Sequence, residues 1–181
     1  MDEKLKDAAS QIRLVVLDVD GVLTDGSIWT GAAGEVVKRF YTRDGLGIVM
    51  LRKAGIPVAL LTGRISEQTA HRAAELGIDA VQQGKTFKGE AFAELLRKFS
   101  VKAEEVAYMG DDVPDIPPLT LAGLPACPAD ADPAVLPLAK FVSPARGGNG
   151  AVRSLAELIL RAQGKWDALV DRYYVHGEKA Q

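Results

Sequence analysis

Short apolar runs alternate along the chain with longer segments in which apolar residues recur every three or four positions. The short runs begin near Leu14, Pro57, Ala80, Val106, Gly123 and Phe141, and each predicts a strand. The longer segments predict helices over residues 45–54, 66–76, 88–99 and 150–163. Strands and helices that alternate in this way form βαβ units. The pattern therefore predicts an α/β fold with a doubly wound parallel sheet.

The first run, Leu14 to Leu17, is apolar at every position. A strand of this kind is buried on both faces, as a central strand of a parallel sheet is. Ligands of such sheets bind outside the carboxyl ends of the strands. We therefore look for function in the residues that directly follow each predicted strand.

One segment interrupts the alternation between the first strand and the first helix. Residues 27–30 and 35–41 have strand-like patterns and flank the turn sequence 31–34. This arrangement predicts a β-hairpin inserted at about 27–41. No linker or internal repeat is evident, so we expect a single domain over residues 1–181, with a C-terminal tail from about 164 to 181.

Composition and charge narrow the class of protein. The 181 residues are 48% apolar and 25% charged, which is ordinary for a globular domain, and the net charge of −2 argues against nucleic acid or an acidic membrane as the main partner. The uncharged stretch 116–129 contains four prolines and cannot cross a bilayer as a helix. The N-terminus has no apolar signal segment, and the single cysteine, Cys127, excludes an internal disulfide. We expect a cytoplasmic protein.

The first predicted strand ends in Asp18-Val19-Asp20-Gly21. Two carboxylates this close to a buried strand repel each other unless a cation or a proton lies between them. One interpretation is a pair of solvated loop aspartates. The other is a metal site beside a carboxylate nucleophile, which splits phosphoryl transfer into two steps.

The next two strands end in groups that suit an anion. Thr62-Gly63-Arg64 places a hydroxyl and a guanidinium before a helix, although a helix cap with a surface arginine explains the same residues. Lys85 and Lys88 follow the third strand, and either can neutralise a phosphate. We favour Lys88 because it is nearer to the start of the helix.

The fourth strand is followed by three further carboxylates, Asp111, Asp112 and Asp115. A site with several carboxylate oxygens favours Mg²⁺ over zinc or copper. Asp111 is the best candidate ligand, because it follows the strand most closely. Solvated turn residues remain the alternative interpretation for Asp112 and Asp115.

The order of these motifs along the chain is D-x-D-G, Thr-Gly-Arg, Lys and Gly-Asp-Asp-x-x-Asp, each after a successive strand. It resembles that of the haloacid dehalogenase superfamily of phosphotransferases, whose fold is Rossmann-like. The resemblance implies that Asp18 attacks phosphorus and that Asp20 acts as general acid and then as general base. It implies that Thr62 and Lys88 hold the phosphoryl group.

The same resemblance implies a Mg²⁺ site. Its ligands would be Asp18, the backbone carbonyl of Asp20, and Asp111, with Asp112 and Asp115 as supporting residues. Members of the superfamily often carry a cap domain, but the intervals between the motifs are too short here for one. A site without a cap is open to water, so we expect a second subunit to supply the lid.

Four segments, 18–26, 43–47, 62–64 and 147–153, resemble more closely the family of phosphatases that act on 3-deoxy-D-manno-octulosonate (KDO) 8-phosphate. The chain departs from that family at Ser154, where an acidic residue is frequent. The resemblance implies a Mg²⁺-dependent homotetramer of the lipopolysaccharide pathway, assembled through the hairpin and the C-terminal tail. A phosphatase for a nine-carbon, sialic-type phosphate is the nearest alternative, and a phosphorylated receiver or a non-catalytic binding protein are the others.

The family resemblance also implies contacts with an anionic 2-keto sugar acid phosphate. The implied substrate-binding residues are Asp20, Arg43, Asp44, Gly45, Gly63, Arg64, Arg72 and Lys88. Arginine binds carboxylates in a bidentate manner, so Arg64 or Arg72 is expected to recognise the sugar carboxylate. For Arg72 the alternative is a solvated position on the face of a helix.

Overall fold

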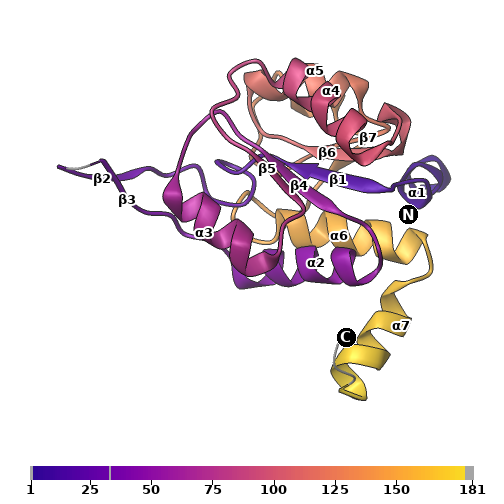
Figure 1. The fold of residues 1–181 in the computed structure, drawn as a ribbon. Helices are drawn as coiled ribbons and strands as arrows, with labels where there is room; N and C mark the ends of the chain where they lie inside the picture. The colour runs from indigo at the N-terminus through magenta and orange to yellow at the C-terminus, as the bar shows by residue number, and fades with distance from the viewer. Residues whose placement is uncertain (1, 33, 178–181) are drawn as a thin grey trace.

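The core of the protein is a six-stranded sheet with helices on both faces, as the computed structural model shows for residues 2–32 and 34–177 (Figure 1). The strands are β1 (Leu14–Leu17), β4 (Val58–Leu61), β5 (Ala80–Gln82), β6 (Val106–Met109), β7 (Leu124–Cys127) and β8 (Phe141–Val142). Their order is β5-β4-β1-β6-β7-β8, and all neighbouring strands are parallel. The predicted doubly wound parallel sheet is confirmed.

Strand β1 lies at the centre because its apolar residues serve both faces of the sheet. Val15 and Leu17 belong to the apolar cluster on one face, and Leu14 and Val16 belong to the cluster on the other. This alternation follows from the two-residue period of a strand. β1 pairs with β4 on one side and with β6 on the other, so the residue that follows it, Asp18, is held between two further strand ends.

The helices form two layers. They are α1 (Glu3–Ser10), α2 (Thr42–Lys53), α3 (Glu67–Leu76), α4 (Lys88–Phe99), α5 (Ile116–Leu121), α6 (Ala151–Ala162) and α7 (Trp166–Val170). Short 3₁₀ turns cover Ala103–Glu105, Val113–Asp115 and Leu136–Leu138, and a π-helical turn covers Asp171–Val175. Helices α4 and α5 cover one face of the sheet, and α2 and α6 cover the other (Figure 1).

Three of these helices, α1, α5 and α7, were not predicted from the sequence, because they are short. α5 begins with Pro117 and Pro118 near its N-terminus, where proline is tolerated because no N–H is needed there. Within the described part of the chain, no helix has the length and apolar character needed to cross a membrane.

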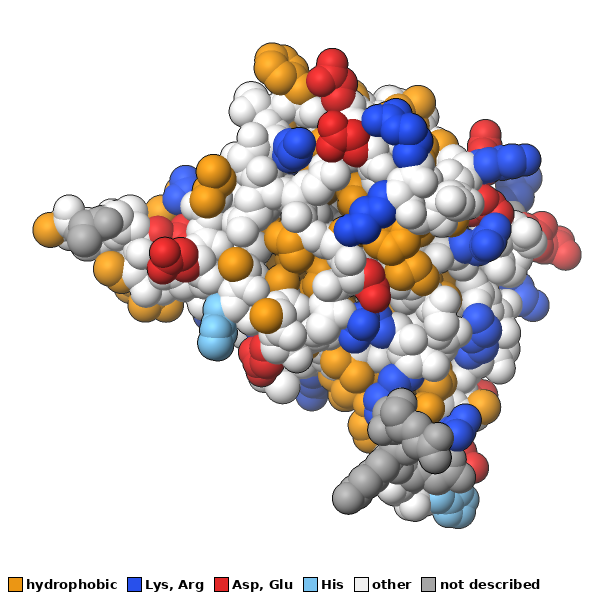
Figure 2. All heavy atoms as spheres, viewed as in Figure 1, with side chains coloured by type: hydrophobic (Ala, Val, Ile, Leu, Met, Phe, Trp, Pro, Cys, Tyr) orange, Lys and Arg blue, Asp and Glu red, His pale blue; other side chains and the backbone are white. Residues whose placement is uncertain are grey.

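The predicted hairpin is present as a separate two-stranded antiparallel sheet, β2 (Trp29–Gly31) and β3 (Gly34–Val37). Its second strand is shorter than the predicted 35–41, because Lys38 leaves the pairing and its side chain is buried against the body of the protein. The hairpin projects away from the sheet (Figure 1). Its exposed apolar side chains, on the projection seen in Figure 2, are Ile28, Trp29, Val36 and Val37.

A cap domain would be inserted between β1 and β4 or between α4 and β6. In the described part of the chain, the first interval contains the hairpin and α2, and the second contains the 3₁₀ turn Ala103–Glu105. The absence of a cap domain agrees with the prediction for the part of the chain that is described. The carboxyl edge of the sheet is therefore bordered by loops and by the base of the hairpin.

Helix α2 begins at Thr42, three positions before its predicted start, so Arg43, Asp44 and Gly45 lie in its first turn. The Asp44 side chain is buried and accepts hydrogen bonds from the backbone N–H groups of Gly150, at 3.1 Å, and Arg153, at 2.7 Å. The first N–H groups of a helix have no partner within it. Asp44 therefore caps α6 from a distant part of the chain and fixes the loop before it.

We predict that Asp44→Ala lowers the free energy of unfolding by about 1–3 kcal/mol, because it leaves buried N–H groups at the start of α6 without an acceptor. Asp44→Asn retains one acceptor oxygen and should lose less. Urea denaturation of the two variants tests this expectation. An unchanged midpoint for Asp44→Ala would show that water replaces the lost contacts.

Candidate active site

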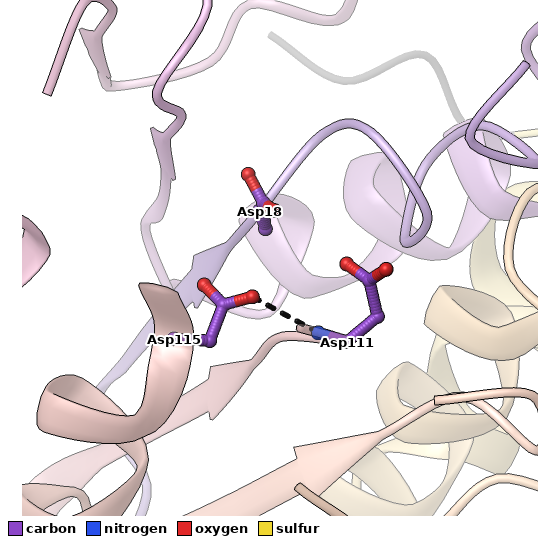
Figure 3. Close-up of side chains that lie close together, drawn as sticks. All are labelled: Asp18, Asp111 and Asp115. Atoms are coloured by element: carbon purple, nitrogen blue, oxygen red, sulfur yellow. Dashed lines mark hydrogen bonds between the residues drawn. The ribbon is translucent and has the colours of Figure 1, made fainter. Parts of the chain in front are cut away.

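Three carboxylates meet at the carboxyl edge of the sheet. Asp18 directly follows β1, Asp111 follows β6, and Asp115 ends the 3₁₀ turn Val113–Asp115. One oxygen from each lies within 4.8 Å of the others, and Figure 3 shows the three side chains close together. The edge at which the sequence predicts the chemistry is thus strongly acidic.

Lys88 supplies the positive charge within this cluster. It is 3% exposed, and its Nζ lies 2.9 Å from Asp18 Oδ2 and 2.6 Å from Asp115 Oδ1. Burial acts to lower the pKa of Lys88, but the two carboxylates outweigh it and hold the pKa above its usual value. Lys85 instead forms an exposed ion pair with Glu94 at 3.5 Å, so the geometry favours Lys88 over Lys85 as the phosphate-binding lysine.

Every oxygen of Asp115 is already engaged. Oδ1 accepts hydrogen bonds from Lys88 Nζ and, at 2.5 Å, from the Tyr108 hydroxyl. Oδ2 accepts from the backbone N–H groups of Asp111, at 3.0 Å, and Asp112, at 3.2 Å. Asp115 is fully buried, so the interpretation of this residue as a solvated turn aspartate is wrong. Its contacts fit a supporting position that orients Lys88 and the loop carrying Asp111.

Asp112 is exposed, and its carboxylate accepts a hydrogen bond from the N–H of Val113 at 2.7 Å. Its side chain therefore caps the turn, and only its backbone N–H reaches Asp115. The predicted support of the metal site by the Asp112 carboxylate stays a prediction.

Asp18 and Asp111 differ from Asp115, because each keeps one buried oxygen, Oδ1, without a hydrogen-bond partner. Burial and then the neighbouring carboxylates raise the pKa of Asp18 to about 7 and that of Asp111 to about 8. Buried carboxylate oxygens without a donor are the ligands that hard divalent cations prefer. The two orphaned oxygens therefore fit a metal ion between the ends of β1 and β6.

Glycines make room for this arrangement. Gly21 has a φ of +87°, and a Cβ added there would lie 2.0 Å from Asp111 Oδ2, so a side chain would displace the carboxylate. Gly147 packs against the carbonyl of Gly21, and the N–H of Gly148 donates to the carbonyl of Val22 at 2.9 Å. The glycine-rich segment before α6 therefore supports the loop that follows Asp18.

Asp20 lies outside the three-carboxylate cluster and contacts two cations. Lys38 Nζ donates a close hydrogen bond to Asp20 Oδ1, and Arg64 Nε lies 3.7 Å from Oδ2. Glu35 lies beside the same group, with Oε2 3.3 Å from Arg64 Nη2. Lys38 and Glu35 were missed in the sequence analysis. Their only signal was a pair of charges three positions apart in the second strand of the hairpin.

The Thr62-Gly63-Arg64 segment lies at the end of β4. Thr62 is buried, and its carbonyl accepts from the N–H of Lys85 at 3.1 Å, which ties the segment to the loop before α4. Gly63 is exposed, and Arg64, with 44% of its side chain exposed, reaches towards Asp20. A hydroxyl and a guanidinium thus border the acidic edge, as an anion site requires.

The remaining predicted substrate residues lie on α2 and α3. Arg43 is exposed, but Asp44 caps α6. Gly45 lies so close to Arg72 that a Cβ there would be 2.3 Å from Nη2. Arg72 pairs with Glu75 at 2.8 Å. This packing gives Asp44 and Gly45 structural roles, and their contact with a substrate stays a prediction.

Arg72 also lines a cavity of about 640 Å³ between α3 and the segment that follows the hairpin. The other residues that line the cavity are Lys38, Phe40, Thr42, Glu67, Gln68, His71 and Glu75. Lys38 reaches Asp20 as well, so the cavity borders the acidic edge through this residue. Arg72 is therefore not the purely solvated helix-face residue of the alternative interpretation.

Comparison with known proteins agrees with this geometry. The model of the haloacid dehalogenase-like hydrolase family matches residues 46–123. The chain is 46% identical over 159 residues to "3-deoxy-D-manno-octulosonate 8-phosphate phosphatase KdsC" of Escherichia coli K12, and the match covers 88% of this chain and 85% of that protein.

Solved structures are similar over the whole fold. The crystal structure of 3-deoxy-D-manno-octulosonate 8-phosphate phosphatase from Yersinia pestis has a TM-score of 0.90 at 43% identity, covering 92% of this chain and 90% of that one. The structure of the enzyme of that name from Moraxella catarrhalis, in complex with magnesium, phosphate and KDO, has a TM-score of 0.92 at 36% identity. The match covers 96% of this chain and 99% of that one. The chain belongs to the haloacid dehalogenase-like hydrolases and, within them, to the family of 3-deoxy-D-manno-octulosonate 8-phosphate phosphatases.

Proposed function

We propose that this protein is a phosphoric monoester hydrolase that cleaves 3-deoxy-D-manno-octulosonate 8-phosphate to KDO and phosphate with Mg²⁺ as cofactor. The observation that carries the proposal is the buried cluster in which Lys88 bridges Asp18 and Asp115, while Asp18 and Asp111 keep unpartnered oxygens. The 46% identity to KdsC and the magnesium, phosphate and KDO in the Moraxella catarrhalis structure support the same activity.

Asp18 is the proposed nucleophile. A carboxylate oxygen of Asp18 forms a bond to phosphorus as the bond from phosphorus to the sugar oxygen breaks, which gives an aspartyl phosphate. Lys88 and Thr62 are the proposed holders of the transferring group, and the position of Lys88 Nζ 2.9 Å from Asp18 Oδ2 supports this role. Lys88 contacts both the nucleophile and Asp115, so it also fixes the direction in which Asp18 faces.

Asp20 is the proposed general acid and base. It donates a proton to the leaving sugar oxygen in the first step. In the second step it accepts a proton from the water that attacks phosphorus, and the bond to Asp18 breaks. The same carboxyl group thereby returns to its starting state in each turnover.

The Asp18 and Asp111 side chains, with the backbone carbonyl of Asp20, would hold Mg²⁺. When bound, the ion supplies positive charge that offsets the carboxylates and the substrate phosphate. Asp115 keeps Lys88 and the N–H groups of Asp111 and Asp112 in place around this site.

Substrate recognition is assigned to arginines beside the site. Arg64 is the leading candidate for the sugar carboxylate, because it is partly exposed and extends next to Asp20. Arg72 is the second, and its guanidinium must share its charge with Glu75. Arg43 and Gly63 are exposed and complete the proposed set with Asp20 and Lys88.

We also propose a homotetramer of single-domain, cytoplasmic subunits comprising residues 1–181. The hairpin supports this assembly, because Trp29 is 61% exposed and Val36 is 55% exposed on an isolated two-stranded sheet. Such a sheet is marginally stable alone, and a symmetric oligomer buries its apolar side chains. Together with the C-terminal tail, neighbouring hairpins would cover the open edge.

A phosphate-release assay with Mg²⁺ tests the function directly. The substrates to compare are KDO 8-phosphate, a nine-carbon 2-keto sugar acid phosphate, a neutral sugar phosphate and p-nitrophenyl phosphate. We expect the highest kcat/KM for KDO 8-phosphate. Preference for the nine-carbon acid would keep the chemistry but change the substrate, and no release from any of them would contradict the proposal.

We predict that Asp18→Asn abolishes turnover while the fold stays intact, because an amide does not attack phosphorus. Asp20→Asn should lower kcat by about 10²–10⁴-fold, which is the usual contribution of general acid–base catalysis. Phosphate release by the purified variants measures both effects. Near-normal activity of Asp18→Asn would be incompatible with the mechanism.

The raised pKa values of Asp18, about 7, and Asp111, about 8, predict a pH-dependent response to metal. In the metal-free protein both groups bind protons more tightly when folded, so their contribution to stability decreases as the pH rises from about 4 to about 8. Mg²⁺ replaces these protons. We expect it to raise Tm more at about pH 8.5 than at about pH 5.5.

Thermal unfolding with Mg²⁺ and with a chelator, at both pH values, measures this effect. Asp111→Asn is the control, because it removes one titrating ligand and should reduce the response at the higher pH. Equal stabilisation at both pH values in the wild-type protein would mean that the ion binds elsewhere.

For Arg64→Ala we predict a decrease in kcat/KM of about 10–100-fold on KDO 8-phosphate, the equivalent of one charge-assisted hydrogen bond of about 1.5–3 kcal/mol. On p-nitrophenyl phosphate, which has no carboxylate, the decrease should be much smaller. Arg72→Ala provides the comparison at the second arginine. Equal losses on both substrates would assign the arginine to the phosphate group or to the fold.

A further inference from the structure

The base of the hairpin brings a buried cation to Asp20. Lys38 follows β3 directly, and its side chain is only 2% exposed. Its Nζ donates to Asp20 Oδ1, and the next carboxylate oxygen, Glu35 Oε2, lies 3.7 Å away. Burying an ammonium group is costly unless it is paired. The contact with Asp20 is therefore a specific feature of this fold and not a mobile surface ion pair.

Glu35, in β3, attaches the end of the hairpin that carries Lys38 to the start of α3. Its Oε1 accepts a hydrogen bond from the Ser66 hydroxyl at 2.5 Å, and its backbone carbonyl accepts from Gln68 Nε2 at 3.3 Å. Both partners belong to the start of α3, which follows the Thr62-Gly63-Arg64 turn. These hydrogen bonds attach the segment that carries Lys38 to the start of α3, next to the loop that borders the active site.

The two oxygens of Asp20 have different surroundings. Oδ1 is held by Lys38, whereas Oδ2 is buried without a hydrogen-bond partner, and the Nε of Arg64 is 3.7 Å from it. A carboxyl group that is fixed through one oxygen presents the other in a single direction. Oδ2 accepts no hydrogen bond and has only the more distant Arg64 guanidinium beside it, so it is the oxygen available to exchange a proton with a reacting group.

We propose that Lys38 is a positioning residue for catalysis, which orients Asp20 so that Oδ2 faces the leaving oxygen of the substrate. The proposal rests on the proposed function, in which Asp20 is the general acid. Proton transfer depends steeply on geometry, and a displacement of about 1 Å can cost on the order of 10²-fold in rate. The inserted hairpin then contributes to the chemistry of its own subunit, in addition to any part in assembly.

The test compares substrates that need the acid with a substrate that does not. An alkyl phosphate such as KDO 8-phosphate expels an alkoxide that must be protonated, whereas p-nitrophenyl phosphate expels a stable phenolate. The kcat/KM value reports the steps up to formation of the aspartyl phosphate. We expect Lys38→Met to lower kcat/KM by about 10–100-fold on the alkyl phosphate and by less than about 3-fold on p-nitrophenyl phosphate.

Arg39→Met is the matched control. Arg39 is the neighbouring cation, but it is half exposed and pairs with Asp25 at 3.5 Å, away from Asp20. The variant removes the same charge from the same segment and should retain wild-type kcat/KM on both substrates. A comparable loss in Arg39→Met would assign the effect to the overall charge of the hairpin and would overturn the proposal.

A rescue experiment separates positioning from damage to the fold. Lys38→Cys treated with 2-bromoethylamine regains an ammonium group at about the reach of lysine, and the native thiol, Cys127, is buried. Alkylation should restore most of the activity on the alkyl phosphate, while the wild-type protein treated in the same way stays unchanged. Failure of rescue in a variant that unfolds at the wild-type temperature would contradict the positioning role.

Asp20→Asn distinguishes failure of this proposal from failure of the proposed function. Asp20→Asn should lower kcat/KM much more on the alkyl phosphate than on p-nitrophenyl phosphate. If it does so and Lys38→Met does not, Asp20 is the acid as proposed and the role of Lys38 is wrong. If Asp20→Asn lowers kcat/KM equally on the two substrates, Asp20 is not the general acid, and the roles proposed for Asp20 and for Lys38 are both wrong. Equal losses on both substrates in Lys38→Met would mean that Lys38 serves the phosphate or the fold.

Discussion

The active edge is organised around one buried ammonium that faces more negative charge than it can neutralise. Lys88 contacts Asp18 and Asp115 directly, and Asp111 lies in the same cluster. Charges of one sign are costly together in a buried site unless a counter-charge or protons balance them. Burial, and then the neighbouring carboxylates, raise the pKa of Asp18 to about 7 and that of Asp111 to about 8. A divalent cation bound between Asp18 and Asp111 would supply the missing positive charge.

The parallel sheet holds these charged residues in fixed positions at its carboxyl edge. β1 is covered on both faces, so Asp18 is fixed at its end by an apolar core, with β4 and β6 on either side. The acidic residues are oriented by neighbouring groups, such as Tyr108 and the N–H groups that bind Asp115. Gly21 leaves space for Asp111, and Gly147 packs against the carbonyl of Gly21. The site is therefore prepared for its ligands before they bind.

The strand-end residues were predictable because a parallel sheet brings the carboxyl ends of its strands to one edge. Asp18 and Thr62 directly follow their strands and Asp111 is the second residue after β6, so the topology brings the three near one edge of the sheet. Lys88 was also identified, since it begins α4, and the structure distinguishes it from the exposed Lys85.

Other roles depend on contacts between distant segments, which no local pattern reveals. Asp44 was assigned to substrate on the basis of family resemblance, but its carboxylate caps α6. Lys38 and Glu35 were missed, because the position of the hairpin depends on its attachment to Ser66 and Asp20. The second strand was expected to extend to residue 41, but it ends at Val37, and the next residue, Lys38, contacts Asp20. Sequence periodicity gives the elements, whereas these side-chain contacts decide how an inserted element meets the sheet.

The central claim is that Asp18 carries the phosphoryl group during turnover. Mixing the enzyme with Mg²⁺ and KDO 8-phosphate, quenching rapidly and reducing with borohydride converts an aspartyl phosphate to homoserine, which peptide mass spectrometry locates. We predict homoserine at position 18 in the wild-type protein, and none there when substrate is omitted. Rapid phosphate release with no modification of Asp18, or with modification at another carboxylate, would contradict the account.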